Sequence, residues 1–103
     1  MQKQEIYIVT KGHPVNKNTA DSVVAQIFSR VPLLDPNRIY KLSKFCGDEF
    51  WKNKVPASDR TFVGIYIFEQ VEMGNLPLEH VPGKHEYPKY YRVKYNYQTL
   101  KRN

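Results

Sequence analysis

The spacing of hydrophobic residues predicts a first helix that ends at Pro32. Apolar side chains recur at helical spacing on one face, at Val23, Val24, Ile27, Phe28 and Val31. Residues three and four apart share a face of an α-helix, so this stripe should pack against a core. Thr19 suits the N-cap position and Asp21 the first turn. We therefore expect an amphipathic helix that begins near Thr19.

A second, shorter helix is expected before Gly47. Asp35-Pro36 is a start signal, because proline is favoured at the first position of a helix. An apolar stripe follows at Ile39, Leu42, Phe45 and Cys46. Asp48 would then begin a further turn, in which Phe50 and Trp51 would bury their rings against the preceding helix.

Two kinds of signal conflict between residues 58 and 73. Residues 61–68 are rich in β-branched and aromatic side chains, which favour a strand. Ser58, however, suits a helix N-cap, and Gly74-Asn75 followed by Pro77 is typical of a helix end. We predict a helix.

This third helix should be central and buried, because its side chains are apolar around most of the circumference between Phe62 and Phe68. Gly64 costs about 1 kcal/mol relative to alanine inside a helix. We expect it to mark a close contact with another helix.

Short strands are predicted on either side of the helices. Residues 5–10 are β-branched and aromatic, and residues 11–18 should form a polar loop. Residues 76–81 and 89–97 should pair as a hairpin across residues 82–88. Alternation in the last strand places Tyr91, Val93, Tyr95 and Tyr97 on one face, and Tyr90, Arg92, Lys94 and Asn96 on the other. The expected fold class is α+β: one domain, residues 1–103, with three helices, an N-terminal strand and a C-terminal antiparallel hairpin.

The residue types that support catalysis are scattered. His13, His80, His85 and the single cysteine, Cys46, show no spacing typical of a metal site or a nucleophile with its base. We expect no enzyme activity, no cofactor and no metal, with Cys46 in the core. One cysteine also favours a reducing compartment, so a cytoplasmic location is expected. No apolar stretch suits a membrane span or a secretory signal, so we expect a soluble, unexported protein.

Charge and aromatic residues concentrate in the last twenty residues. This segment holds five of the eight tyrosines and six of the sixteen basic residues, against one acid, Glu86, in a chain of formal net charge +6. Planar rings between cations suit a polyanion with stackable groups. The expected partner is therefore nucleic acid, with DNA favoured. An acidic protein partner, or self-association through a strand edge, would explain the charge equally well, and such small basic proteins are frequent in mobile elements.

The order of predicted elements between Leu42 and Tyr95, two helices, a Gly-Asn-Leu-Pro stop and a hairpin with a basic Pro-Gly tip, resembles that of winged-helix DNA-binding domains. The resemblance covers about half of the chain and includes no diagnostic motif. It implies that the last helix faces the major groove with Arg60, Thr61, Glu69 and Gln70, and that the hairpin is a wing that contacts phosphates. The apolar third helix and the N-terminal strand depart from that pattern.

The candidate nucleic-acid contacts come from the helix start, the hairpin and the tail: Arg60, Lys84, His85, Lys89, Tyr90, Arg92, Lys94, Lys101 and Arg102. Tyr90 shares a strand face with two of these cations, which makes it the best candidate for base stacking. The other tyrosines of the last strand are more typical of sheet packing. Lys101 and Arg102 are more typical of a solvated tail than of an arm that contacts phosphates.

Overall fold

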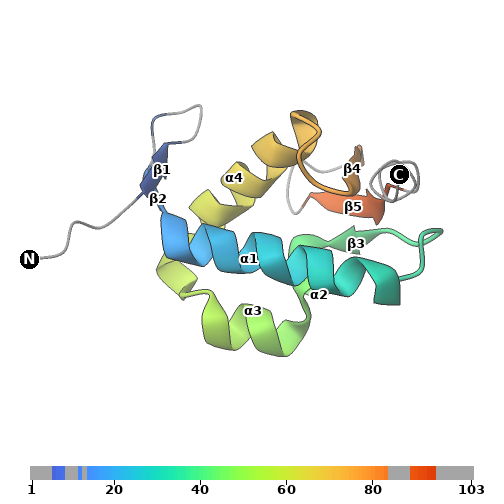
Figure 1. The fold of residues 1–103 in the computed structure, drawn as a ribbon, viewed down its shortest axis with the longest axis horizontal. Coiled ribbons are helices and arrows are strands. Elements are labelled where there is room, and N and C mark those ends of the chain that lie inside the picture. The colour runs from blue at the N-terminus through green and yellow to red at the C-terminus, as the bar shows by residue number, and fades with distance from the viewer. Residues whose placement is uncertain (1–5, 9–11, 13, 84–88, 95–103) are drawn as a thin grey trace, which may run out of the picture.

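The structure, a computed structural model, describes residues 6–8, 12, 14–83 and 89–94, and it has the expected α+β class. Its helices are α1 (Lys17–Arg30), α2 (Leu42–Cys46), α3 (Asp48–Lys54) and α4 (Arg60–Glu72), with 3-10 turns at Val31–Leu33 and Ala57–Asp59. Its strands are β1 (Ile6–Ile8), β2 (Pro14–Asn16), β3 (Tyr40–Lys41), β4 (Leu78–Val81) and β5 (Tyr90–Val93). Figure 1 shows α4 lying across α1.

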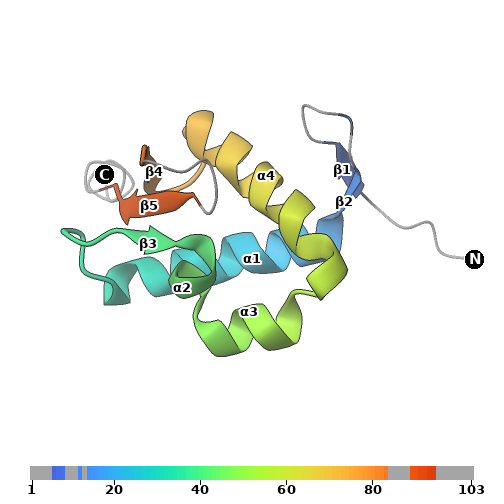
Figure 2. The same ribbon diagram turned by 180° about the vertical axis from the view of Figure 1, so that it is seen from behind.

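The strands form two separate antiparallel sheets. β1 pairs with β2, and a three-stranded sheet has the order β3-β5-β4. Figures 1 and 2 show the β1-β2 hairpin at one end of α1 and the three-stranded sheet at the other. A helical core followed by a hairpin, β4 and β5, is compatible with the winged-helix-like arrangement expected from the sequence.

The core includes an apolar seam between α1 and α4, which buried residues of β2, α2, β4 and β5 join. Ala20, Val23 and Ile27 of α1 are fully buried, as are Val63 and Ile67 of α4. These residues recur at intervals of three and four, which places each set on one face of its helix. The prediction of a buried third helix is therefore confirmed, and its remaining apolar side chains pack partly buried around the same cluster: Phe62, Ile65, Tyr66 and Phe68.

The end of α4 follows the predicted stop signal. Gly74 adopts a positive φ of 80°, and its N–H donates to the Val71 carbonyl at 3.0 Å. The Asn75 N–H donates to the Gln70 carbonyl at 2.9 Å, which completes a Schellman motif. At the start of α4, the expected cap was wrong: Asp59 is the N-cap without a side-chain bond, and Ser58 lies in the preceding 3-10 turn.

Two further helix starts differ from the prediction. α1 begins at Lys17, where the Asn16 side chain accepts a hydrogen bond from the Thr19 N–H at 3.0 Å, so Thr19 is not the cap. The Asp35 side chain instead accepts from the Asn37 N–H at 2.8 Å, which stabilises a turn in competition with a helix. Consequently α2 begins only at Leu42, and Ile39 is 48% exposed.

Two short strands were not predicted. β3 lies between that turn and α2, and β2 falls in residues 11–18, the expected polar loop. β2 has one buried apolar residue, Val15, between Pro14 and Asn16. Strands of two or three residues are too short to show an alternating pattern, and their stability comes from their pairing partners.

Side chains of α1 hold α2 in place. Gln26 Nε2 donates to the Cys46 carbonyl at 2.8 Å, and Arg30 Nε donates to the Phe45 carbonyl at 3.1 Å. The last carbonyls of a helix have no partner within it, so these bonds both satisfy α2 and attach it to α1. Gly47, with a φ of 90°, then turns the chain into α3.

In the described part of the chain, no helix is long and apolar enough to cross a membrane.

The packing of α4 against α1 predicts that Ile67 stabilises the fold more than Ile65 does. Ile67→Ala should lower the free energy of unfolding by about 2–5 kcal/mol, because it leaves a cavity in the core. Ile65→Ala should cost clearly less, since Ile65 is only partly buried. Urea denaturation of both variants measures the difference, and equal losses would contradict the packing of α4 through Ile67.

Candidate nucleic-acid interface

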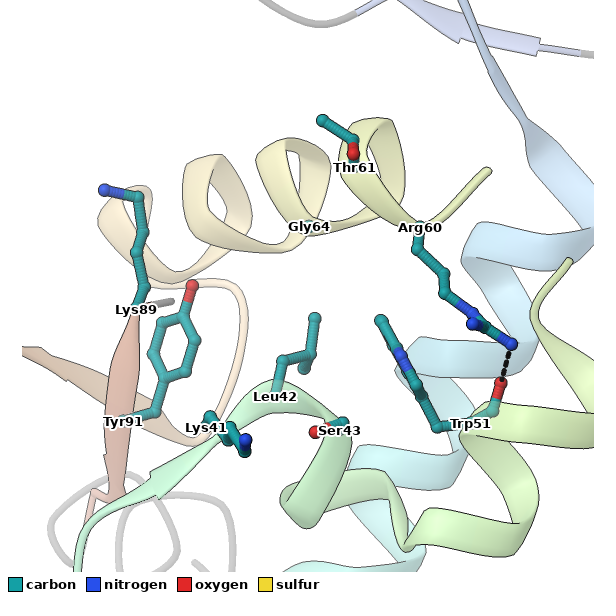
Figure 3. A pocket seen from close by; sticks show the side chains of 9 residues that line it. All are labelled: Lys41, Leu42, Ser43, Trp51, Arg60, Thr61, Gly64, Lys89 and Tyr91. Atoms are coloured by element: carbon teal, nitrogen blue, oxygen red, sulfur yellow. Dashed lines mark hydrogen bonds between the residues drawn. The ribbon is translucent and has the colours of Figure 1, made fainter. Parts of the chain in front are cut away.

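A pocket of about 480 Å³ lies between the start of α2, α3, α4 and β5. Figure 3 shows the side chains that surround it, from Trp51 on α3 to Tyr91 on β5. Its lining consists of Lys41, Leu42, Ser43, Trp51, Arg60, Thr61, Gly64, Lys89 and Tyr91. Three of these residues are basic and none is acidic, so the pocket favours an anionic ligand.

Gly64 opens α4 to this pocket. A Cβ atom built at Gly64 would meet no other atom within 4 Å. The predicted close contact between Gly64 and another helix was therefore wrong. The apolar pattern led to that prediction because it does not distinguish a glycine that packs against a helix from one that faces open space.

Arg60 has a structural role in the pocket wall. Its Nε donates to the Val55 carbonyl at 3.0 Å, and one terminal nitrogen lies 3.4 Å from the Trp51 carbonyl and 3.3 Å from the Lys52 carbonyl. These carbonyls belong to the C-terminal end of α3, so the Arg60 side chain ties α3 to α4. Arg60 was predicted to contact nucleic acid. Its charge remains beside the pocket, but its Nε and one of its terminal nitrogens are directed at the backbone.

Lys89 and Tyr91 bring β5 to the pocket. The Lys89 ammonium lies 4.3 Å from the centroid of the Phe68 ring on α4, a cation–π contact. Tyr91 is 1% exposed, and its ring rises from β5 toward α4 in Figure 3. The sequence-based assignment of Tyr91 to sheet packing is thus confirmed, and its ring also forms part of the pocket wall.

Lys41 was missed by the sequence analysis. It pairs directly with Tyr90 across β3 and β5, and directly paired residues share a face of a sheet. This outer face also carries Arg92 and, one step beyond the end of β5, the exposed Lys94. Because Lys41 also lines the pocket, the outer face of the sheet and the pocket meet at this residue. The sequence did not indicate Lys41, because β3 has only two residues and is too short to show the alternating pattern of a strand.

The predicted alternation of β5 is confirmed over Tyr90–Val93. Tyr90 is 37% exposed on the outer face, whereas Val93 is buried with Tyr91. Arg92 differs from its neighbours because its Nε lies 2.8 Å from the Glu79 carboxylate on β4. That ion pair compensates the charge of Arg92, so Lys94 and Tyr90 are the stronger candidates for contact with a ligand.

The outward face of α4 lacks the polar groups expected of a helix that reads a DNA groove. Thr61 is exposed, but Glu69 and Gln70 are partly buried, and the Gln70 side chain accepts a hydrogen bond from Asn75 at 2.9 Å. Phe50 and Trp51 on α3 pack against the core but are only partly buried, so the expected burial of these rings is confirmed in part. Trp51 faces the pocket.

Several predicted residues lie outside the described part of the chain: Lys84, His85, Tyr95, Tyr97, Lys101 and Arg102. The assignment of Tyr95 and Tyr97 to a packed strand face, and of the four basic residues to a wing or a tail, stays a prediction.

Cys46 and His80, the two described candidates for chemistry, are part of the packing, and His13 lies outside the described residues. Cys46 is fully buried as predicted, and burial raises the pKa of its thiol to about 12, with a smaller opposing effect of Arg30. His80 makes an edge-to-face contact with Phe68, at 5.0 Å between ring centroids. Among the described residues, no group of three or more His, Cys, Asp or Glu side chains could hold a metal ion.

Comparison of the chain with protein-family models, curated proteins and solved structures gives no match.

Arg60 and Arg92 have different partners, so replacing each of them should lower the free energy of unfolding by a different amount. Arg60→Gln should lower the free energy of unfolding by about 1–3 kcal/mol, because three carbonyls lose a charged donor. Arg92→Gln should cost less than about 1 kcal/mol, since its pair with Glu79 is half exposed. Urea denaturation at one pH and ionic strength compares them. An Arg60 variant as stable as the parent would contradict the tie between α3 and α4.

Proposed function

We propose that the protein binds nucleic acid, preferably DNA, through one surface, which we call the basic face. It consists of Lys41, Ser43, Thr61, Lys89, Tyr90 and Lys94. The observation that carries the proposal is a pocket lined by three cations and no carboxylate, joined through Lys41 to an exposed strand face with a tyrosine and a second lysine. The role is binding without catalysis.

The basic face offers the groups that hold a phosphate backbone. Lys41, Lys89 and Lys94 supply positive charge, and the hydroxyls of Ser43 and Thr61 can donate hydrogen bonds to phosphate oxygens. Each phosphate that a lysine neutralises releases condensed counterions, which is a large part of the affinity of DNA-binding proteins. The predicted wing residues Lys84 and His85 would extend this surface.

Affinity on this face should depend little on base sequence. Sequence is read by hydrogen-bonding side chains that reach base edges in a groove. The exposed part of α4 contributes Thr61 and no basic side chain aimed outward, because Arg60 bonds the carbonyls of α3. Contacts to phosphate should therefore dominate, in contrast to the groove-reading helix that the winged-helix resemblance implies.

The salt dependence of binding tests this proposal. Lys41→Gln, Lys89→Gln and Lys94→Gln should each weaken binding to a duplex and reduce the slope of log affinity against log salt by about one unit. Lys52→Gln is the matched control, because it removes one lysine charge from an exposed position of α3, outside the pocket lining. Fluorescence anisotropy with a labelled duplex at several salt concentrations measures each slope.

Two outcomes would contradict the proposal. An equal loss of affinity in the Lys52 variant and in the three others would show that net charge alone attracts the duplex. Absence of binding to any duplex or single strand at low salt, together with saturable binding of a defined acidic peptide, would favour the acidic protein partner.

A further inference from the structure

We propose that the pocket between α2, α3, α4 and β5 accepts one unpaired nucleotide, with its base beside Trp51 and its phosphate near Lys41 and Lys89. This inference rests on the proposed nucleic-acid function and specifies the form of the ligand. It would make strand ends, overhangs and gaps better ligands than an intact duplex.

Gly64 is the first argument for a ligand in this pocket. Glycine is a poor helix former, and it is usually explained inside a helix by a close neighbour. Here, apart from the adjoining residues and backbone of α4 itself, no atom lies within 4 Å of the position of a Cβ, so packing within the protein does not require glycine. The missing side chain instead leaves the backbone of α4 open as a wall that a flat group can approach.

The lining supplies the second argument. The pocket, about 480 Å³, is within the size range of small-molecule sites and has room for a base with its sugar. Trp51, which is partly buried, offers aromatic surface, and the buried residues Leu42 and Tyr91 form an apolar floor. Ser43 and Thr61, which also line the pocket, carry hydroxyls that can bind a ligand. Stacking on aromatic side chains is the usual way in which proteins hold unpaired bases.

The charges indicate where the phosphate would lie. Lys41 ends β3 and Lys89 precedes β5, so both lysines come from the sheet side of the pocket, opposite Trp51. A nucleotide with its base toward Trp51 would extend its phosphate toward this side. Arg60 adds positive charge at the wall while its donors remain on the α3 carbonyls. A base inside a stacked duplex cannot reach a concave site without leaving the stack.

Trp51 is the only tryptophan of the chain, so its fluorescence reports directly on the pocket. Three probes should be titrated: a blunt duplex, the same duplex with a short single-stranded overhang, and that duplex with an abasic overhang. The overhang should quench Trp51 and bind about tenfold or more tighter than the blunt duplex. The abasic overhang keeps the phosphates but should lose most of this gain.

A mononucleotide serves as a fourth probe, because a free nucleotide and a strand share this chemistry. Quenching with similar affinity would identify the free nucleotide as the ligand of the pocket, and much weaker quenching would identify the strand. Both results support the pocket, and quenching by neither the mononucleotide nor the overhang would overturn the proposal.

A larger side chain at position 64 of α4 should fill the pocket, and such a variant tests whether the pocket binds the overhang. Gly64→Leu should keep or raise the melting temperature, because leucine favours a helix and meets no neighbour at Cβ. This variant should lose the additional affinity that the overhang gives over the blunt duplex. Its affinity for the blunt duplex itself should change less than about twofold. Ser22→Leu, at an exposed position of α1 outside the pocket lining, is the control and should retain the gain. If Gly64→Leu unfolds, the smaller Gly64→Ala replaces it, with a partial loss expected.

The proposal is overturned if the abasic overhang binds as tightly as the intact one, or if the Gly64 variant retains the gain. Binding of the blunt duplex without any gain from the overhang would reject the pocket and leave the nucleic-acid function standing. Failure of every oligonucleotide to bind would reject both.

Discussion

The packing of α4 across α1 is the constraint on which the rest of the structure depends. α4 is apolar around most of its circumference, so one neighbouring helix cannot cover it. α1 buries Val63 and Ile67, while β2 and β4 contact other parts of α4. What remains open is the strip around Thr61 and Gly64, where no side chain fills the space beside the helix. The pocket is therefore a consequence of how α4 is covered.

Several polar side chains donate hydrogen bonds to backbone carbonyls at helix ends. Gln26 and Arg30 bind the end of α2, and Arg60 binds the end of α3. Short helices leave a large share of their carbonyls without partners, so these bonds stabilise two helices of five and seven residues. Net charge thus overstates the cationic donors that a ligand meets, because Arg30 and Arg60 donate to backbone carbonyls and Arg92 is ion-paired with Glu79.

The sequence was sufficient to predict the fold class, α4 with its end at Gly74 and the faces of β5, because helical and strand periodicity extend over enough residues there. It was insufficient for β2 and β3, which are too short to show a period. The turn at Asp35 was misread because the same residue type caps helices and stabilises turns. Of the candidate site, Tyr90 and Lys94 were predicted from alternation. The sequence did not predict that Lys41, Trp51 and Gly64 would lie at the site. Their positions depend on which elements become neighbours in space, and a local sequence pattern does not indicate this.

The central claim is that nucleic acid contacts the basic face, and amide chemical shifts of the labelled protein test it most directly. Addition of a duplex with an overhang should shift the amides of Lys41, Thr61, Gly64 and Lys89, and should leave that of Ser22 on α1 unchanged. Shifts that gather on α1 while the basic face stays unperturbed would contradict this account of the protein.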